Sequence, residues 1–147
     1  MRNQNYSIMK RSITLFVSLF LLATSGLFAQ SIEKTLVRSF NIQGAQEVAL
    51  EVDAPVEVKT WSQKIMRIQI NVALERGSES MLRSLIQTGR YNLKGEMLDG
   101  LYTVTIPGLS RQVRVNGSIL SENLSYVVFV PENVHVDILS SSSAQAF

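Results

Sequence analysis

The chain has 147 residues and no cysteine, with 14 Lys and Arg residues against 12 Asp and Glu residues. Three of the basic residues and none of the acidic ones lie in the first 29 positions, so the rest of the chain carries 11 basic residues against 12 acidic ones. This balance excludes the basic surface that a nucleic-acid partner requires. The lack of cysteine excludes disulfides and the lipidated cysteine of a lipoprotein.

Residues 1–29 have the pattern of a secretory signal peptide. A polar, basic start precedes the apolar run from Ser12 to Phe28, and Ala29 fits the small residue before a cleavage site. We expect cleavage after Ala29, with a retained anchor as the alternative because the run is close to the length that spans a bilayer. After cleavage no stable membrane span remains, and the protein is expected in the periplasm, at the cell surface or outside the cell.

The following stretch alternates between apolar and polar residues, which is typical of half-buried strands. Thr35–Ile42 is a weak strand. Gln46–Asp53 and Val56–Trp61 alternate more cleanly, and Ala54-Pro55 separates them because proline cannot donate to a strand ladder. Met66–Leu74 is the longest alternating run, so it predicts the most regular strand of the chain.

One helix is predicted, over Glu79–Thr88, where apolar residues recur at helical spacing. Ser78 is a suitable N-cap residue and Gly89 can end the helix in a left-handed conformation. Because the segment is short, its apolar stripe must pack on the sheet to hold it.

Turn residues divide the rest of the chain into short strands. Asp99-Gly100 favours a hairpin turn between Tyr91–Met97 and Leu101–Ile106. Ser125–Val130 is apolar on both faces, which predicts a central strand, and Val134–Ile138 alternates again after a proline turn.

These patterns predict a mainly β fold: a short β-solenoid or sandwich-like stack of about eight or nine strands, with one short helix near residues 79–88. We expect a signal peptide at 1–29, a single β domain at 30–138 and a flexible tail at 139–147.

Two segments share a strand–proline–strand form. Glu47–Val72 reads EVALEVDAPVEVKTWSQKIMRIQINV, and Tyr126–Ile138 reads YVVFVPENVHVDI. Through these two segments, the chain resembles the putative adhesin family of exported bacterial proteins that are built from β-strand repeats. The resemblance implies a short β-solenoid or sandwich-like stack whose rungs bury valine and isoleucine.

Four carboxylates occupy successive outward positions along two predicted strands: Glu47, Glu51, Asp53 and Glu57. Paired carboxylates can bind calcium or hydrolyse glycosides. A solvated strand face gives the same string, and the spacing matches no calcium loop. No catalytic residue, metal site or cofactor is therefore predicted here.

Aromatic residues offer a second candidate site. Trp61 ends a strand beside a turn, and together with Tyr91, Tyr102 and Tyr126 it could form a platform for a ligand. Aromatic residues in strands also pack in cores and against neighbouring strands.

The single histidine, His135, lies two residues before Asp137, so the two could act as a base or ligand pair on one strand face. A metal site usually needs three or four ligands, so a solvated strand face is the favoured interpretation of the pair.

The function favoured by these observations is a non-catalytic, envelope-associated structural or interaction module. It would bind through unpaired strand edges or through a face that includes the four carboxylates and Trp61. A protein partner or self-association is favoured over a small molecule. The alternatives are a small carbohydrate- or lipid-binding module using Trp61 and the tyrosines, and a hydrolase without a recognisable motif.

Overall fold

The computed structural model describes residues 32–140, which belong to the compact unit from Ser31 to Phe147. The signal peptide at 1–29, its cleavage site and most of the tail at 139–147 lie outside the described residues, so those assignments stay predictions. Within residues 32–140, no helix has the length and apolar character needed to cross a membrane.

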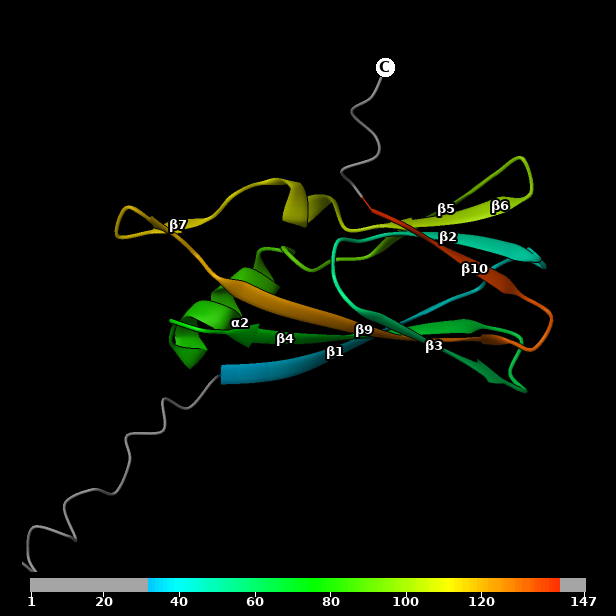
Figure 1. Cartoon of the computed structure of the whole chain (residues 1–147), viewed down its shortest axis with the longest axis horizontal. Helices are drawn as coiled ribbons and strands as arrows, with labels where there is room; N and C mark the ends of the chain where they lie inside the picture. Colours follow the sequence, from blue (N-terminus) through cyan, green and yellow to red (C-terminus); the bar gives the residue numbers. More distant parts are fainter. Residues whose placement is uncertain (1–31, 141–147) are drawn as a thin grey trace, which may run out of the picture. The chain divides into compact units, whose positions relative to one another are not determined.

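Two four-stranded sheets contain most of the described strands (Figure 1). Sheet A has the order β1-β4-β9-β3, with strands β1 (Ile32–Phe40), β4 (Met66–Leu74), β9 (Glu122–Pro131) and β3 (Val56–Trp61). Sheet B has the order β10-β2-β6-β5, with strands β10 (His135–Leu139), β2 (Glu47–Glu51), β6 (Leu101–Thr105) and β5 (Lys94–Leu98). The short strands β7 (Arg114–Val115) and β8 (Ser118–Ile119) pair separately.

The two sheets bury one hydrophobic core between them. Alternate residues of β4 are all buried and belong to the same cluster as Val48 and Leu50 of β2 and Val104 of β6. The predicted mainly β fold is therefore confirmed, with ten strands in the described part of the chain. The sheets are open and sandwich-like, and the structure does not show a solenoid.

The two strand–proline–strand segments carry the chain from one sheet to the other. Residues 52–55 connect β2 to β3, and residues 132–134 connect β9 to β10. These two corners lie at opposite ends of the strands (Figure 1), and they create parallel pairs, β2 with β10 and β3 with β9. Because both connections are short, the outermost strands β3 and β10 lie on the same side of the sandwich.

The helix forms where the sequence predicts it, as α2 (Glu79–Gln87). The Ser78 hydroxyl accepts a hydrogen bond from the Met81 backbone N–H at 3.1 Å, and Gly89 adopts a φ of +78° after the last turn. Leu82 is buried in the core, so packing holds this short helix as expected. A 3₁₀ helix, η2 (Pro107–Ser110), was not predicted, because Pro107-Gly108 reads in sequence only as the end of a strand.

Some strand boundaries differ from the prediction. β5 begins at Lys94, since Tyr91 is buried in the core without joining the ladder. β9 begins at Glu122 because its antiparallel ladder with β4 extends to the pair of Leu74 and Glu122. The predicted hairpin turn is confirmed, with positive φ at both Asp99 and Gly100.

Candidate functional site

One edge strand of sheet A, β1, is protected against the addition of another strand. Edge strand β1 places Lys34 and Arg38 in register with Val72 and Ile68 of β4. Since Val72 and Ile68 are buried, the two charged side chains point toward the core face of the edge. Inward-pointing charges of this kind discourage edge-to-edge pairing.

The opposite side lacks this protection. Val58 of β3 lies in register with the buried Val128, and Ile138 of β10 lies in register with the buried Leu50. Val58 is nevertheless 42% exposed and Ile138 is 48% exposed, because no strand of the described residues lies beyond them. We call β3 and β10, with their inward-facing Val56, Val58, Val136 and Ile138, the β3–β10 edge.

Trp61 lies at the end of β3 on the outer face of sheet A. Its indole N–H donates a hydrogen bond to the Ile65 carbonyl at 2.9 Å, and its ring centroid lies 5.4 Å from that of Phe129. The Arg67 guanidinium carbon lies 4.9 Å from the centroid of the indole, in a cation–π contact. These contacts hold Trp61 half-buried beside the β3–β10 edge, with Arg67 against its ring.

The structure does not bring the four candidate carboxylates onto one face. Glu47 and Glu51 are exposed on β2 in sheet B, and Glu57 is exposed on β3 in sheet A. Asp53 lies on the corner between them. The proline corner moves the chain to the other sheet, so continuous alternation in sequence does not produce a continuous surface. A contact role for these residues stays a prediction.

The prediction that tyrosines join Trp61 in an aromatic platform is wrong. Tyr91, Tyr102 and Tyr126 are all buried in the core. Their rings pack between the sheets, as Tyr102 does against Phe40 with centroids 6.1 Å apart. They therefore cannot combine with Trp61 to form an exposed stacking surface.

His135 and Asp137 do form a pair on the exposed face of β10, with Nε2 and Oδ1 3.2 Å apart. Within residues 32–140, no three acidic, histidine or cysteine side chains are grouped as a metal site would need. The two side chains thus form a solvent-exposed pair on β10, which belongs to the β3–β10 edge.

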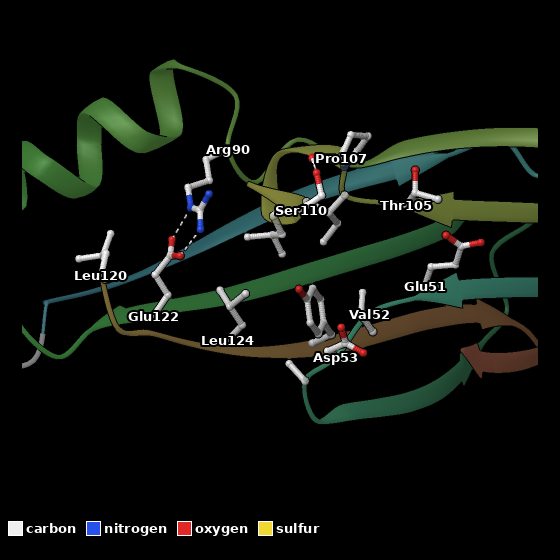
Figure 2. Close-up of a pocket in the computed structure, with 14 residues that line it drawn as sticks. Glu51, Val52, Asp53, Arg90, Thr105, Pro107, Ser110, Leu120, Glu122 and Leu124 are labelled. Carbon is white, nitrogen blue, oxygen red and sulfur yellow. Dashed lines mark hydrogen bonds and ion pairs between the residues drawn. The ribbon is translucent and has the colours of Figure 1, made fainter. Parts of the chain in front are cut away.

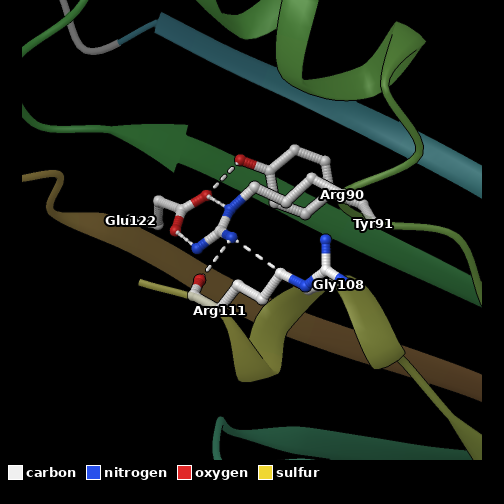
Figure 3. Close-up of polar contacts among 5 residues, drawn as sticks. All are labelled: Arg90, Tyr91, Gly108, Arg111 and Glu122. Atoms are coloured by element: carbon white, nitrogen blue, oxygen red, sulfur yellow. Dashed lines mark hydrogen bonds and ion pairs between the residues drawn. The ribbon is translucent and has the colours of Figure 1, made fainter. Parts of the chain in front are cut away.

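A polar network of mostly buried side chains, which the sequence did not reveal, joins the turn after α2 to η2 and β9 (Figure 3). Arg90 donates to both carboxylate oxygens of Glu122, and its Nη1 also donates to the carbonyls of Gly108 at 3.0 Å and Arg111 at 2.8 Å. The Tyr91 hydroxyl donates to the same carboxylate. Glu122 lies 32 positions from Arg90, and no local motif marks the pairing.

These contacts determine the charge state of the network. Burial opposes ionisation of Glu122, yet hydrogen bonds from Arg90 and Tyr91 hold the pKa of its carboxyl below the ordinary value. Burial raises the pKa of Tyr91, and its hydrogen bond to Glu122 raises it further. Arg90 and Glu122 therefore form an ion pair at neutral pH, with Tyr91 as a neutral donor.

This network should make stability sensitive to acid. Because the pKa of Glu122 is lower in the folded protein, its contribution to stability is complete above the ordinary value of 4.5 and is lost as the pH falls through the folded-state pKa. We expect the difference in free energy of unfolding between the wild type and Glu122→Gln to be largest near neutral pH and to narrow below about pH 4.5. Urea denaturation between pH 7 and pH 3 measures this difference. A difference independent of pH would contradict the assigned charge state.

The network forms one wall of a cavity of about 460 Å³. The carboxylates of Glu51, Asp53 and Glu122 lie around it, on β2, on the β2–β3 corner and at the start of β9 (Figure 2). Tyr126 also lines the cavity, while its hydroxyl is buried and has no hydrogen-bond partner in the described part of the chain.

No family model matches the sequence, and no curated protein matches it. Two crystal structures show a loose likeness. A putative cell adhesion protein from Clostridium sporogenes ATCC 15579 is 13% identical, with a TM-score of 0.39 over 74% of this chain and 47% of its own. A putative adhesin from Bacteroides fragilis NCTC 9343 is 10% identical, with a TM-score of 0.38 over 73% of this chain and 41% of its own.

The chain thus spans less than half the length of either structure.

Proposed function

We propose that the domain is a non-catalytic interaction module of an exported, envelope-associated protein, and that it binds another polypeptide by strand addition at the β3–β10 edge. The observation that carries this proposal is the exposure of Val58 and Ile138, two side chains that face the core on neighbouring edge strands. An added strand would pair with the open backbone and cover these apolar groups. The signal-peptide pattern of residues 1–29 supports export.

A second copy of the chain is the partner that best fits this edge. A two-fold axis perpendicular to the sheets would pair β3 with β3 and β10 with β10, so that both sheets continue across the interface. The outward charges support this arrangement. Glu57 and Lys59 flank Val58, so an antiparallel pair centred on Val58 places each Lys59 opposite the Glu57 of the other copy.

The charges on β10 have the same arrangement as those on β3. His135 and Asp137 flank Val136, so an antiparallel β10 pair centred on Val136 places each histidine opposite an aspartate. Opposite charges across a strand pair are favourable, and like charges are unfavourable. Each of the two edge strands is thus complementary in charge to a second copy of itself.

The full-length protein, purified after export, should therefore form dimers by light scattering, and Val58→Lys combined with Ile138→Lys should yield monomers at the same concentration. Charged groups at these positions would be buried without partners in the interface. Val37→Lys is the matched control, because Val37 is 57% exposed on the protected strand β1, and it should leave the mass unchanged.

A charge exchange tests the register. Lys59→Glu alone would oppose glutamates across the interface and should weaken dimerisation, whereas Glu57→Lys combined with Lys59→Glu should restore it. Two results would contradict the proposal. One is a wild type that stays monomeric at about 100 micromolar, a concentration on the order of the dissociation constants of weak interfaces. The other is equal effects of both variants.

A further inference from the structure

The exposed pair on β10 has the spacing of two ligands of one metal ion. The Nε2 atom of His135 lies 3.2 Å from Oδ1 of Asp137, and the two side chains are 74% and 55% exposed. Two ligands of a tetrahedral zinc ion, each bonded at about 2.0–2.1 Å, lie about 3.3 Å apart. Small movements of two solvent-exposed side chains would therefore let both atoms bind the same ion.

One copy of the chain supplies too few ligands for such an ion. A structural zinc site holds four ligands. The sequence has one histidine and no cysteine, and within residues 32–140 no three acidic, histidine or cysteine side chains are grouped together. A zinc site on β10 would thus be incomplete without a second copy of the same strand.

The antiparallel β10 pair of the proposed dimer would bring two such pairs together. Val136 is in register with the buried Val48, so His135 and Asp137, which flank it, lie on the outer face of sheet B. In a pair centred on Val136, each histidine lies opposite an aspartate, with Cβ atoms about 4.5–5.5 Å apart. Both histidines and both aspartates would then surround one point above the two-fold axis.

The chemistry of these four side chains selects the ion. Imidazole suits zinc and other transition metals, whereas calcium and magnesium take oxygen ligands. Two imidazoles and two carboxylates form a tetrahedral set, and the two negative charges balance those of Zn²⁺. Glu47 lies in register with His135 and is exposed beside it on β2, so it adds a further carboxylate next to each histidine.

We propose that Zn²⁺ binds between two copies of the chain, to His135 and Asp137 of each copy, and strengthens the dimer. This inference rests on the proposed strand addition at the β3–β10 edge. Zinc would also select the register, because a pair centred on Asp137 would bring the two aspartates together and carry the two histidines apart.

Light scattering of the full-length protein, purified after export and without a histidine tag, measures the dimer dissociation constant in zinc chloride and in EDTA. We expect about 100 micromolar zinc to lower this constant at least tenfold, because zinc binds only the paired state tightly. Calcium chloride at the same concentration should leave it unchanged. Calorimetric titration should give one zinc ion for two chains.

His135→Ala and Asp137→Ala each remove one ligand from each copy, so zinc and EDTA should then give the same dissociation constant. Asp99→Asn is the matched control. It removes an exposed carboxylate from the turn between β5 and β6, at the other edge of sheet B, and should keep the full zinc effect. Because each variant is compared with itself in zinc and in EDTA, any change in its metal-free dimerisation does not affect the result.

A wild type that dimerises equally in zinc and in EDTA would overturn the metal site and leave the strand-addition proposal standing. One zinc ion per chain, or an undiminished zinc effect in His135→Ala, would overturn the metal site as well. A wild type that stays monomeric in both solutions would contradict both proposals.

Discussion

Arg90→Met should lower the free energy of unfolding by about 1.5–3 kcal/mol, because it leaves the Glu122 carboxylate, whose side chain is mostly buried, without its charged hydrogen-bond donor. The side chains of both residues are 9% exposed and line the cavity of about 460 Å³, so water can replace the lost partner only in part. The substitution also removes the hydrogen bonds to the Gly108 and Arg111 carbonyls. These bonds hold η2 against the turn that follows α2. Urea denaturation at pH 7 measures the loss.

Arg83→Met is the matched control for this prediction. Arg83 pairs with Glu79 at 2.9 Å on the exposed side of α2, so its loss should change the free energy of unfolding by less than about 0.5 kcal/mol. Removing both buried partners in Arg90→Met with Glu122→Met should be less destabilising than the sum of the single changes, because neither charge is then left alone. A loss under about 1 kcal/mol in Arg90→Met would show that the buried pair contributes no more than an exposed one.

Gly108→Ala should lower the free energy of unfolding by about 1–3 kcal/mol, because there is no space for a side chain at this position. A Cβ atom on Gly108 would lie 2.2 Å from the Arg90 carbonyl oxygen and 2.8 Å from its carbonyl carbon. Both are backbone atoms and cannot rotate away, so η2 must move and its hydrogen bonds from Arg90 must lengthen. Thermal and urea denaturation of the variant measure the effect.

Gly77→Ala provides the comparison. Its Cβ would meet the Leu74 Cδ1 at 2.9 Å, which is the end of a flexible side chain, so the expected loss is smaller. Because Gly108 and Arg90 share the same contact, their effects should not add in the double variant Arg90→Met with Gly108→Ala. Additive losses would mean that the clash and the ion pair act on separate parts of the protein.

Local chemistry was sufficient to predict most of the secondary structure. Strict alternation in Met66–Leu74 identified both the strand β4 and its buried face, since a strand turns successive side chains to opposite sides. Ser78 and Gly89 marked the ends of α2 because capping depends on residues within one turn. The 3₁₀ helix η2 was missed because its contacts with Arg90 are distant in sequence.

The candidate sites were less predictable from sequence. Trp61 was proposed as a contact residue and lies at the end of β3, while the tyrosines proposed with it are core residues. The Arg90–Glu122 pair gave no signal in the sequence, since the two residues meet only when distant segments pack together.

By itself, the amino-acid sequence determined an export leader pattern, a strand-rich domain, one helix and the residues that turn inward along each strand. All of these follow from the order of neighbouring residues and from the two-residue period of a strand. The tertiary structure alone decided that the proline corners cross between sheets and form parallel pairs, which separates Glu57 from Glu47 and leaves Val58 and Ile138 open on one side. Strand pairing is decided by contacts far apart in the chain, and the period of a single strand carries no information about which strand will lie beside it.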